Sequence, residues 1–280
     1  LTEQPTMLQV KRTDTTMQSC LESVSHTGGN MRFKLLCCKA LQREVASLIY
    51  ACPHVIDVTM VRQRLHDTPK QLMQALQQEI DAVDSGDDVH TDQHESRPID
   101  AILLGYGLCS NAIAGLSSGK YPLVAPRAHD CITLLMGSRA QYDEDFRINS
   151  GTYYYTRGWY DLGALFLDDD LLRRKRQQYM DRFQDEDTVE YLMDVERDML
   201  RNYRRMAHIS WPNIPDDESI RSAQKTVGAK GWRFDRYPGN DRLLRQLLWG
   251  QWDDSEFLVV PPGQRIAPSY DDRIIKAVAE

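Results

Sequence analysis

Two short stretches of the chain carry residue types that could hold a metal ion or attack a substrate. GLCSN contains Cys109, and PRAHDC contains His129 and Cys131. A third thiol, Cys38, stands nearer the N-terminus. Thiolate and imidazole are common zinc ligands, and thiolates favour zinc or iron–sulfur clusters over magnesium or calcium. We therefore expect a metal site of Cys38, Cys109, His129 and Cys131, with zinc as the metal and an iron–sulfur cluster as the alternative.

The elements that would position these residues are buried strands. Three apolar segments end just before them: Met31–Cys37, Ile99–Leu104 and Tyr121–Ala125. In open α/β sheets, ligands bind outside the carboxyl ends of the strands. The sequence thus predicts that the three thiols and the imidazole meet at one edge of a parallel sheet.

Two other interpretations of the same residues stay open. Cys109 or Cys131 could be a nucleophile with His129 as its base, because a cysteine that begins a helix has a lowered pKa. The cysteines could also be small apolar residues of the core. We favour this second interpretation for Cys37, which lies on the opposite strand face from Cys38.

Three further side chains are candidates for catalysis. Arg127 stands beside the proposed ligands and could bind a carboxylate or phosphate, or form a surface salt bridge. Glu44 could support the ligands from the helix that follows Cys38, or be an ordinary exposed glutamate. His66 follows the second predicted strand and would point to the same edge, although capping or a core position also explains it.

Gly105 and Gly107 flank Tyr106 and superficially resemble a phosphate-binding loop. The third glycine of that motif is missing, and no acidic residue follows at the required spacing. We expect these glycines to let the backbone turn close to Cys109 instead.

Strands and helices alternate along the chain, which predicts an α/β fold with a parallel-sheet, Rossmann-like core and helices on both faces. A helix is expected between Ile99–Leu104 and Tyr121–Ala125. We predict a flexible N-terminal arm over residues 1–30 and a Rossmann-like domain over 31–150. A C-terminal α/β extension or second lobe covers 151–280.

Composition narrows the function classes. The 280 residues carry a net charge of -7 and are 41% hydrophobic, which gives no argument for a nucleic-acid partner. No apolar run is long enough to span a membrane, and the N-terminus does not read as a signal peptide. The six cysteines do not form a disulfide framework. We expect a cytoplasmic protein with a small-molecule substrate, and leave a homo-oligomer open.

Several segments resemble the family called domain of unknown function 1638, including CKALQRE, LHDTP, LGYGLCSNAIAGL, PRAHDCITLLMGS, GTYYYTRGW and RNYRRMAHI. Arg157 stands where the family's aromatic segment would have proline. The resemblance implies methyl-group chemistry, because members are often encoded near corrinoid-dependent methyltransferases. A corrinoid protein or methyltransferase subunit is the implied partner, although this chain lacks an Asp-x-His-x-x-Gly corrinoid motif.

These observations lead to one main hypothesis and one alternative. The main hypothesis is a metal-dependent enzyme whose zinc activates a thiol or water, in methyl-group transfer. The alternative is a non-enzymatic accessory protein that binds an iron–sulfur cluster or a metal for a corrinoid methyltransferase system.

Overall fold

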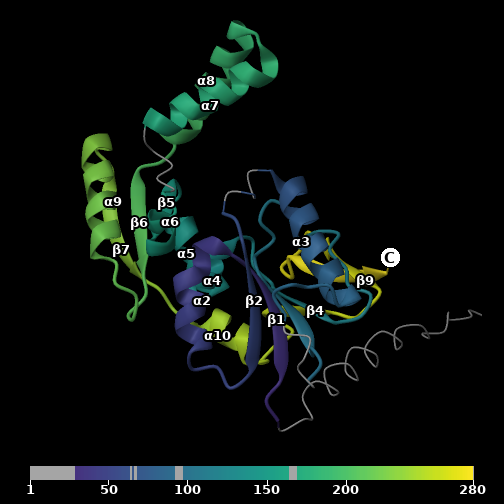
Figure 1. Cartoon of the computed structure of the whole chain (residues 1–280). Helices are drawn as coiled ribbons and strands as arrows, with labels where there is room; N and C mark the ends of the chain where they lie inside the picture. The colour runs from purple at the N-terminus through teal and green to yellow at the C-terminus, as the bar shows by residue number, and fades with distance from the viewer. Residues whose placement is uncertain (1–28, 64, 66–67, 92–96, 164–168, 280) are drawn as a thin grey trace, which may run out of the picture.

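A five-stranded sheet organises the chain (Figure 1), which the computed structural model describes over residues 29–63, 65, 68–91, 97–163 and 169–279. The strand order is β2-β1-β3-β4-β8. Four strands run parallel, namely β1 (Arg32–Cys38), β2 (Val55–Val61), β3 (Ala101–Gly105) and β4 (Leu123–Pro126). β8 (Phe257–Val260) is antiparallel to β4. The predicted α/β class with a mostly parallel sheet is confirmed. His66 and residues 1–28 of the predicted arm lie outside the described residues.

Helices cover both faces of this sheet. Successive residues of β1 point to opposite faces, so Leu35 and Cys37 enter one core while Leu36 and Cys38 enter the other. The first core is closed by the helices α2 (Gln42–Ile49), α4 (Cys131–Met136) and α10 (Arg242–Leu248). The second is closed by α3 (Pro69–Ser85) and the hairpin of β9 (Gln264–Pro268) and β10 (Ile275–Ala279).

A second, three-stranded parallel sheet has the order β5-β6-β7. Its strands are β5 (Thr152–Thr156), β6 (Arg205–Ser210) and β7 (Arg233–Pro238). Tyr154 and Ala207 join the first core, whereas Tyr155 and Met206 pack with residues of α9 (Asp217–Lys230) on the other face.

The C-terminal part of the chain returns to the first sheet. The second sheet ends at Pro238, and the chain then returns to the first sheet through α10 and β8. All four residues of β8 are apolar and buried, and this strand is covered on both faces, because Phe257 and Val259 enter the first core and Leu258 and Val260 the second.

Five shorter or peripheral helical elements complete the described part of the architecture. They are the 3-10 turn η1 (Lys39–Leu41), α5 (Arg139–Ile148), α6 (Arg157–Asp161) and a hairpin of α7 (Asp169–Phe183) with α8 (Glu186–Arg201). The α7–α8 hairpin projects away from both sheets (Figure 1). No helix in the described ranges has the length and apolarity needed to cross a membrane.

The helix predicted between β3 and β4 is wrong. Residues of this connection form turns, and three consecutive side-chain-bearing residues adopt left-handed backbone conformations: Cys109 (φ 46°), Ser110 (φ 59°) and Asn111 (φ 66°). A right-handed helix cannot run through left-handed residues. The connection is instead buried through Ala112, Ile113 and Leu116.

Candidate functional site

The first sheet changes its direction of winding between β1 and β3, which are neighbours in the order β2-β1-β3-β4. Ligands of open α/β sheets bind in the crevice at such a switch point, outside the carboxyl ends of the strands. Cys38 is the last residue of β1, and Cys109 follows the end of β3. Cys131 begins α4 after β4. Three thiols thus come from the ends of three neighbouring strands.

The loops that carry Cys109 and Cys131 are joined through their backbones. The N–H of Leu108 donates to the carbonyl of Ala128 at 2.7 Å, and the N–H of Cys109 donates to the carbonyl of His129 at 2.9 Å. A Cβ on Gly107 would lie 2.7 Å from the Cα of Asp130. Since no real Cβ is tolerated at that separation, the expectation that this glycine allows a close backbone approach is confirmed.

Backbone strain is concentrated at the same place. A residue other than glycine in the left-handed region costs about 1–2 kcal/mol, and Cys109, Ser110 and Asn111 are three in a row. Such strain clusters at active sites and ligand clamps, where the surrounding structure enforces it. The buried Ala112 and Ile113 hold the loop in place. The strain marks the Cys109 loop as a candidate functional element.

The three thiols influence one another electrostatically. Burial raises the pKa of Cys38, of Cys109 (to about 12) and of Cys131. Asp130 and Cys38 raise the pKa of Cys109 further, and Cys109 and Cys38 do the same to Cys131. Their thiolate forms would therefore repel one another across a shared interior region. A thiol nucleophile needs a lowered pKa, so this environment does not favour the cysteine–histidine dyad.

His129 stands apart from the thiols. Its side chain is exposed, and it interacts electrostatically with Asp130. Burial raises the pKa of Asp130, and His129 lowers it by a smaller amount. The carboxylate of Asp130 caps α4 by accepting from the N–H of Ile132 at 3.0 Å and also accepts from the Tyr142 hydroxyl at 2.8 Å. Among the described residues, no three histidine, cysteine or acidic side chains are arranged as a ready-made metal shell. The structure brings Cys38, Cys109 and Cys131 into one region and leaves His129 at its rim.

Tyr106 is a member of this region that the sequence analysis did not single out. Its side chain is 3% exposed, and its hydroxyl has no hydrogen-bond partner among the described residues. Burial raises its pKa, and Cys38, Cys37, Cys109 and Cys131 raise it further. A buried hydroxyl left unpaired costs about 1–3 kcal/mol, so this O–H is a ready donor for a ligand. Its place between two glycines, directly after a buried strand, was the available signal.

Glu44 lies inside the protein near the same strand end. The side chain is 2% exposed, and its Oε2 has no partner in the described part of the chain. Burial raises its pKa to about 7, Arg43 opposes this, and Asp161 adds to it. Glu44 in turn raises the pKa of Cys37. The alternative of an ordinary exposed glutamate is therefore wrong.

The Glu44 carboxyl predicts a specific dependence of stability on pH. The folded protein keeps this proton up to about pH 7, whereas the unfolded chain releases it near 4.5. The contribution of the neutral Glu44 carboxyl to the free energy of unfolding is thus fully present below pH 4.5 and is lost as the pH rises to about 7. Glu44→Gln should raise the free energy of unfolding by about 3 kcal/mol at pH 8 and by little at pH 4.5. Urea unfolding at both pH values measures this, with the exposed Asp87→Asn as control; equal gains at both pH values would contradict it.

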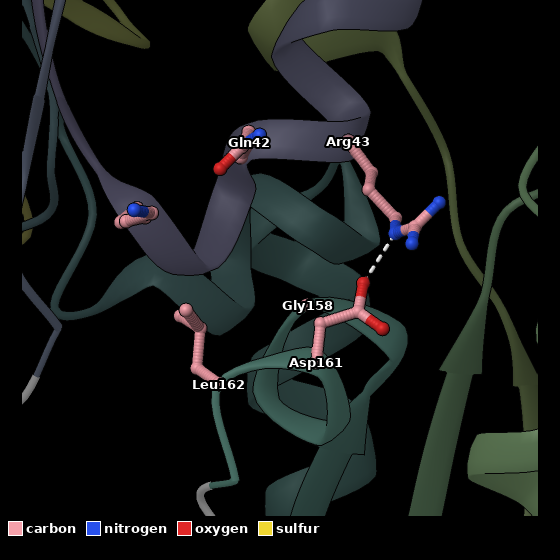
Figure 2. Close-up of a pocket in the computed structure, with 6 residues that line it drawn as sticks. Gln42, Arg43, Gly158, Asp161 and Leu162 are labelled. Atoms are coloured by element: carbon pink, nitrogen blue, oxygen red, sulfur yellow. Dashed lines mark hydrogen bonds and ion pairs between the residues drawn. The ribbon is translucent and has the colours of Figure 1, made fainter.

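A pocket of 410 Å³ opens beside the thiol region (Figure 2). Its lining residues are Lys39, Gln42, Arg43, Gly158, Asp161 and Leu162. It lies where the start of α2 meets α6, so residues after β1 face residues after β5. Arg43 reaches across to Asp161, and their ion pair closes one side. The pocket begins at Lys39, the residue that follows Cys38.

The comparison with known families decides the affiliation of the chain. The family model described as "Protein of unknown function (DUF1638)" matches residues 60–248, which is more than half of the chain. The chain belongs to this family. The DUF1638 match contains Cys109, His129 and Cys131 and leaves Cys38 and Glu44 outside it. A search of curated proteins and a search of solved structures each found no match.

Arg127 lies within the DUF1638 match, but its guanidinium is engaged away from the thiols. It is buried and donates to the carbonyls of Asp254 (2.8 Å) and Arg273 (3.0 Å), and to that of Ile275. It also donates to the Asp254 carboxylate at 3.1 Å. These contacts hold the β9–β10 hairpin against the end of β4. They leave this side chain a poor candidate for binding substrate.

Arg157, the residue found where the DUF1638 aromatic segment would have proline, begins α6. Its guanidinium pairs with Asp161 at 2.8 Å and with Glu218 at 3.0 Å. This side chain therefore ties α6 to the start of α9 and places Asp161 at the pocket.

Proposed function

We propose that this DUF1638 chain is a zinc-dependent enzyme that activates a thiol or a water molecule on a Rossmann-like sheet, with methyl-group transfer as its reaction. The observation that supports it most is the set of three thiols, the buried Cys38 and the half-buried Cys109 and Cys131, from the ends of three neighbouring strands. Cys38 raises the pKa of both other thiols and Cys109 raises that of Cys131, so a divalent cation among them would relieve the repulsion of their thiolates.

The donor set suits a catalytic zinc better than a closed structural one. Catalytic zinc takes three protein ligands and leaves a fourth position for water or substrate. Cys38, Cys109 and Cys131 supply the three thiolates, and the exposed His129 is a candidate fourth ligand when substrate is absent. The unpaired hydroxyl of Tyr106 lies among these thiols and can donate to a group held there.

The chemistry that zinc would supply is a lower pKa for a bound thiol or water, so that it becomes a nucleophile at neutral pH. We assign Glu44 as the acceptor of the proton that the thiol or water loses. Its pKa of about 7 allows it to take up and release a proton at neutral pH, and its Oε2 has no described partner. Tyr106 keeps the substrate oriented through its hydroxyl, and the strained Cys109 loop keeps its thiol directed inward.

In the methyl-transfer reaction the S–H bond of a small thiol breaks and its proton passes to Glu44. The sulfur electron pair forms the new bond to the methyl carbon. The bond from the methyl group to its donor breaks, and that electron pair stays on the donor. By the family resemblance, we propose a methylated corrinoid protein as the donor and a methyltransferase subunit as a partner.

An accessory role with an iron–sulfur cluster is the second candidate. Three cysteines from separate loops, with one position open, also suit a cluster that passes metal or electrons to a partner. All five described cysteines are free, which fits either role in a reducing compartment, so we propose a cytoplasmic location.

Metal analysis of anaerobically purified protein tests the proposal. We expect about one zinc per chain by plasma mass spectrometry, resistant to dialysis, and alkylation of Cys109 only after a chelator is added. Several irons with acid-labile sulfide and absorbance near 400 nm would move the chain to the cluster-binding class. Absence of any metal, with Cys109 freely alkylated, would reject both.

A further inference from the structure

We infer that the pocket beside Cys38 binds the anionic group of the substrate, a carboxylate or a phosphate ester, with Lys39 as its main contact. This inference rests on the proposed function, because it names the class of small molecule held next to the thiols. The substrate class is thus a short molecule with an anion at one end and its reacting group at the other.

Lys39 is the cation that carries the inference. It lines the pocket, its side chain is exposed, and no acidic side chain in the described part of the chain pairs with it. A lysine ammonium offers three donors without a fixed direction, which suits a carboxylate or a phosphate. An anion in the pocket would therefore find an uncommitted positive charge.

Asp161, the acidic residue among the described lining of the pocket, does not cancel this charge. Burial acts to raise the pKa of Asp161, but hydrogen bonds from Arg43 and Arg157 hold it below its ordinary value. Both bonds use the Nε of the arginine, and the pair with Arg43 is drawn in Figure 2. Asp161 is thus a carboxylate already shared by two cations.

The rest of the lining sets the size of the ligand. Gly158 has no side chain and packs directly on the carbonyl of Ala40, which keeps α6 close without filling the pocket. Gln42 adds an amide and Leu162 an apolar wall. A pocket of 410 Å³ lies within the usual range for small-molecule sites.

The adjacency of Lys39 and Cys38 links this pocket to the thiols. Their Cα atoms are about 3.8 Å apart, as for any trans peptide. Cys38 points into the core that also holds Tyr106, whereas Lys39 lines the pocket. A short molecule anchored by its anion at Lys39 would therefore be held at the residue next to Cys38 in the chain.

Two anions, inorganic phosphate and propionate, test the inference on the full chain. The readouts are the concentration-dependent rise of the melting temperature at constant ionic strength, with chloride as the reference, and protection of Lys39 from acetylation, followed by peptide mass spectrometry. Lys39→Met should weaken binding by at least about tenfold, since a charged hydrogen bond is lost. The exposed Lys225→Met on α9 is the matched control and should bind as the wild type does.

Protection by phosphate alone identifies a phosphate ester, and protection by propionate alone identifies a carboxylate. Cys109→Ser should still bind the anion, because the pocket does not need the metal. Anion binding by wild-type protein that contains no zinc after anaerobic purification would reject the proposed function and keep this inference. Equal affinity in Lys39→Met and wild type, or no protection of Lys39 by either anion, would overturn the inference even if zinc is found.

Discussion

Cys109→Ser is expected to lose the bound zinc and the activity together while the fold persists. The substitution removes a thiol that is coupled to both others: Cys38 raises its pKa, and it raises the pKa of Cys131. Even residues that only support a ligand cost 10- to 100-fold in metal affinity, so loss of a ligand should cost more than about a hundredfold. Metal content and activity measure the effect, and far-UV circular dichroism measures the fold.

Two matched variants separate a ligand from a neighbour. Cys38→Ser should behave like Cys109→Ser, because Cys38 raises the pKa of both other thiols. His129→Ala should retain the metal, because its side chain is exposed. Retention of zinc by Cys38→Ser together with its loss in His129→Ala would restore the histidine as an essential ligand and contradict the three-thiol site.

The strands could be predicted from the sequence because their burial leaves a strong pattern. The strands Thr152–Thr156 and Phe257–Val260 show this pattern. Both are runs rich in aromatic or β-branched residues, the types that pack well in a sheet. The partner of such a strand is not written in its own residues, however. Phe257–Val260 pairs with β4, more than a hundred residues earlier.

The connection after β3 shows why local pattern failed there. Apolar residues such as Ala112, Ile113 and Leu116 have the spacing of a helix face and are indeed buried. The left-handed backbone at Cys109–Asn111 is imposed by contacts with the loop after β4, which are distant in sequence. Propensity cannot reveal such a constraint, because the surrounding structure enforces it.

The sequence predicts where in the fold the candidate site lies, but not all of the residues that form it. Strand ends located Cys38, Cys109 and Cys131, since parallel strands meet at one edge. Which side chains point inward depends on rotamers and neighbours. In the structure His129 is exposed, whereas Tyr106, which was not a candidate, is buried near the thiols. Glu44 followed the same rule: its helix could be predicted, whereas the burial of its side chain depends on neighbours that are distant in sequence.

Gly158→Ala is expected to cause the largest loss of stability of the substitutions considered. A Cβ at this position would lie 1.9 Å from the carbonyl oxygen of Ala40, far inside van der Waals contact. Ala40 is buried in η1 between β1 and α2, so its carbonyl cannot move alone. Overpacking of this kind costs about 3 kcal/mol or more, measured as the free energy of unfolding in urea.

Gly228→Ala on α9 is the matched control for that substitution. No atom lies within 4 Å of the Cβ it would add, so alanine should stabilise the helix by about 1 kcal/mol. Gly158→Ala should lower the free energy of unfolding and Gly228→Ala should raise it, although both glycines lie in helices. The difference between them therefore measures the contact between α6 and η1 and not helix propensity. That contact sets the distance between Asp161 on α6 and Arg43 on α2, whose pairing shapes the anion pocket. If Gly158→Ala folds, it should therefore also weaken phosphate binding. If Gly158→Ala is as stable as Gly228→Ala, α6 does not pack on η1.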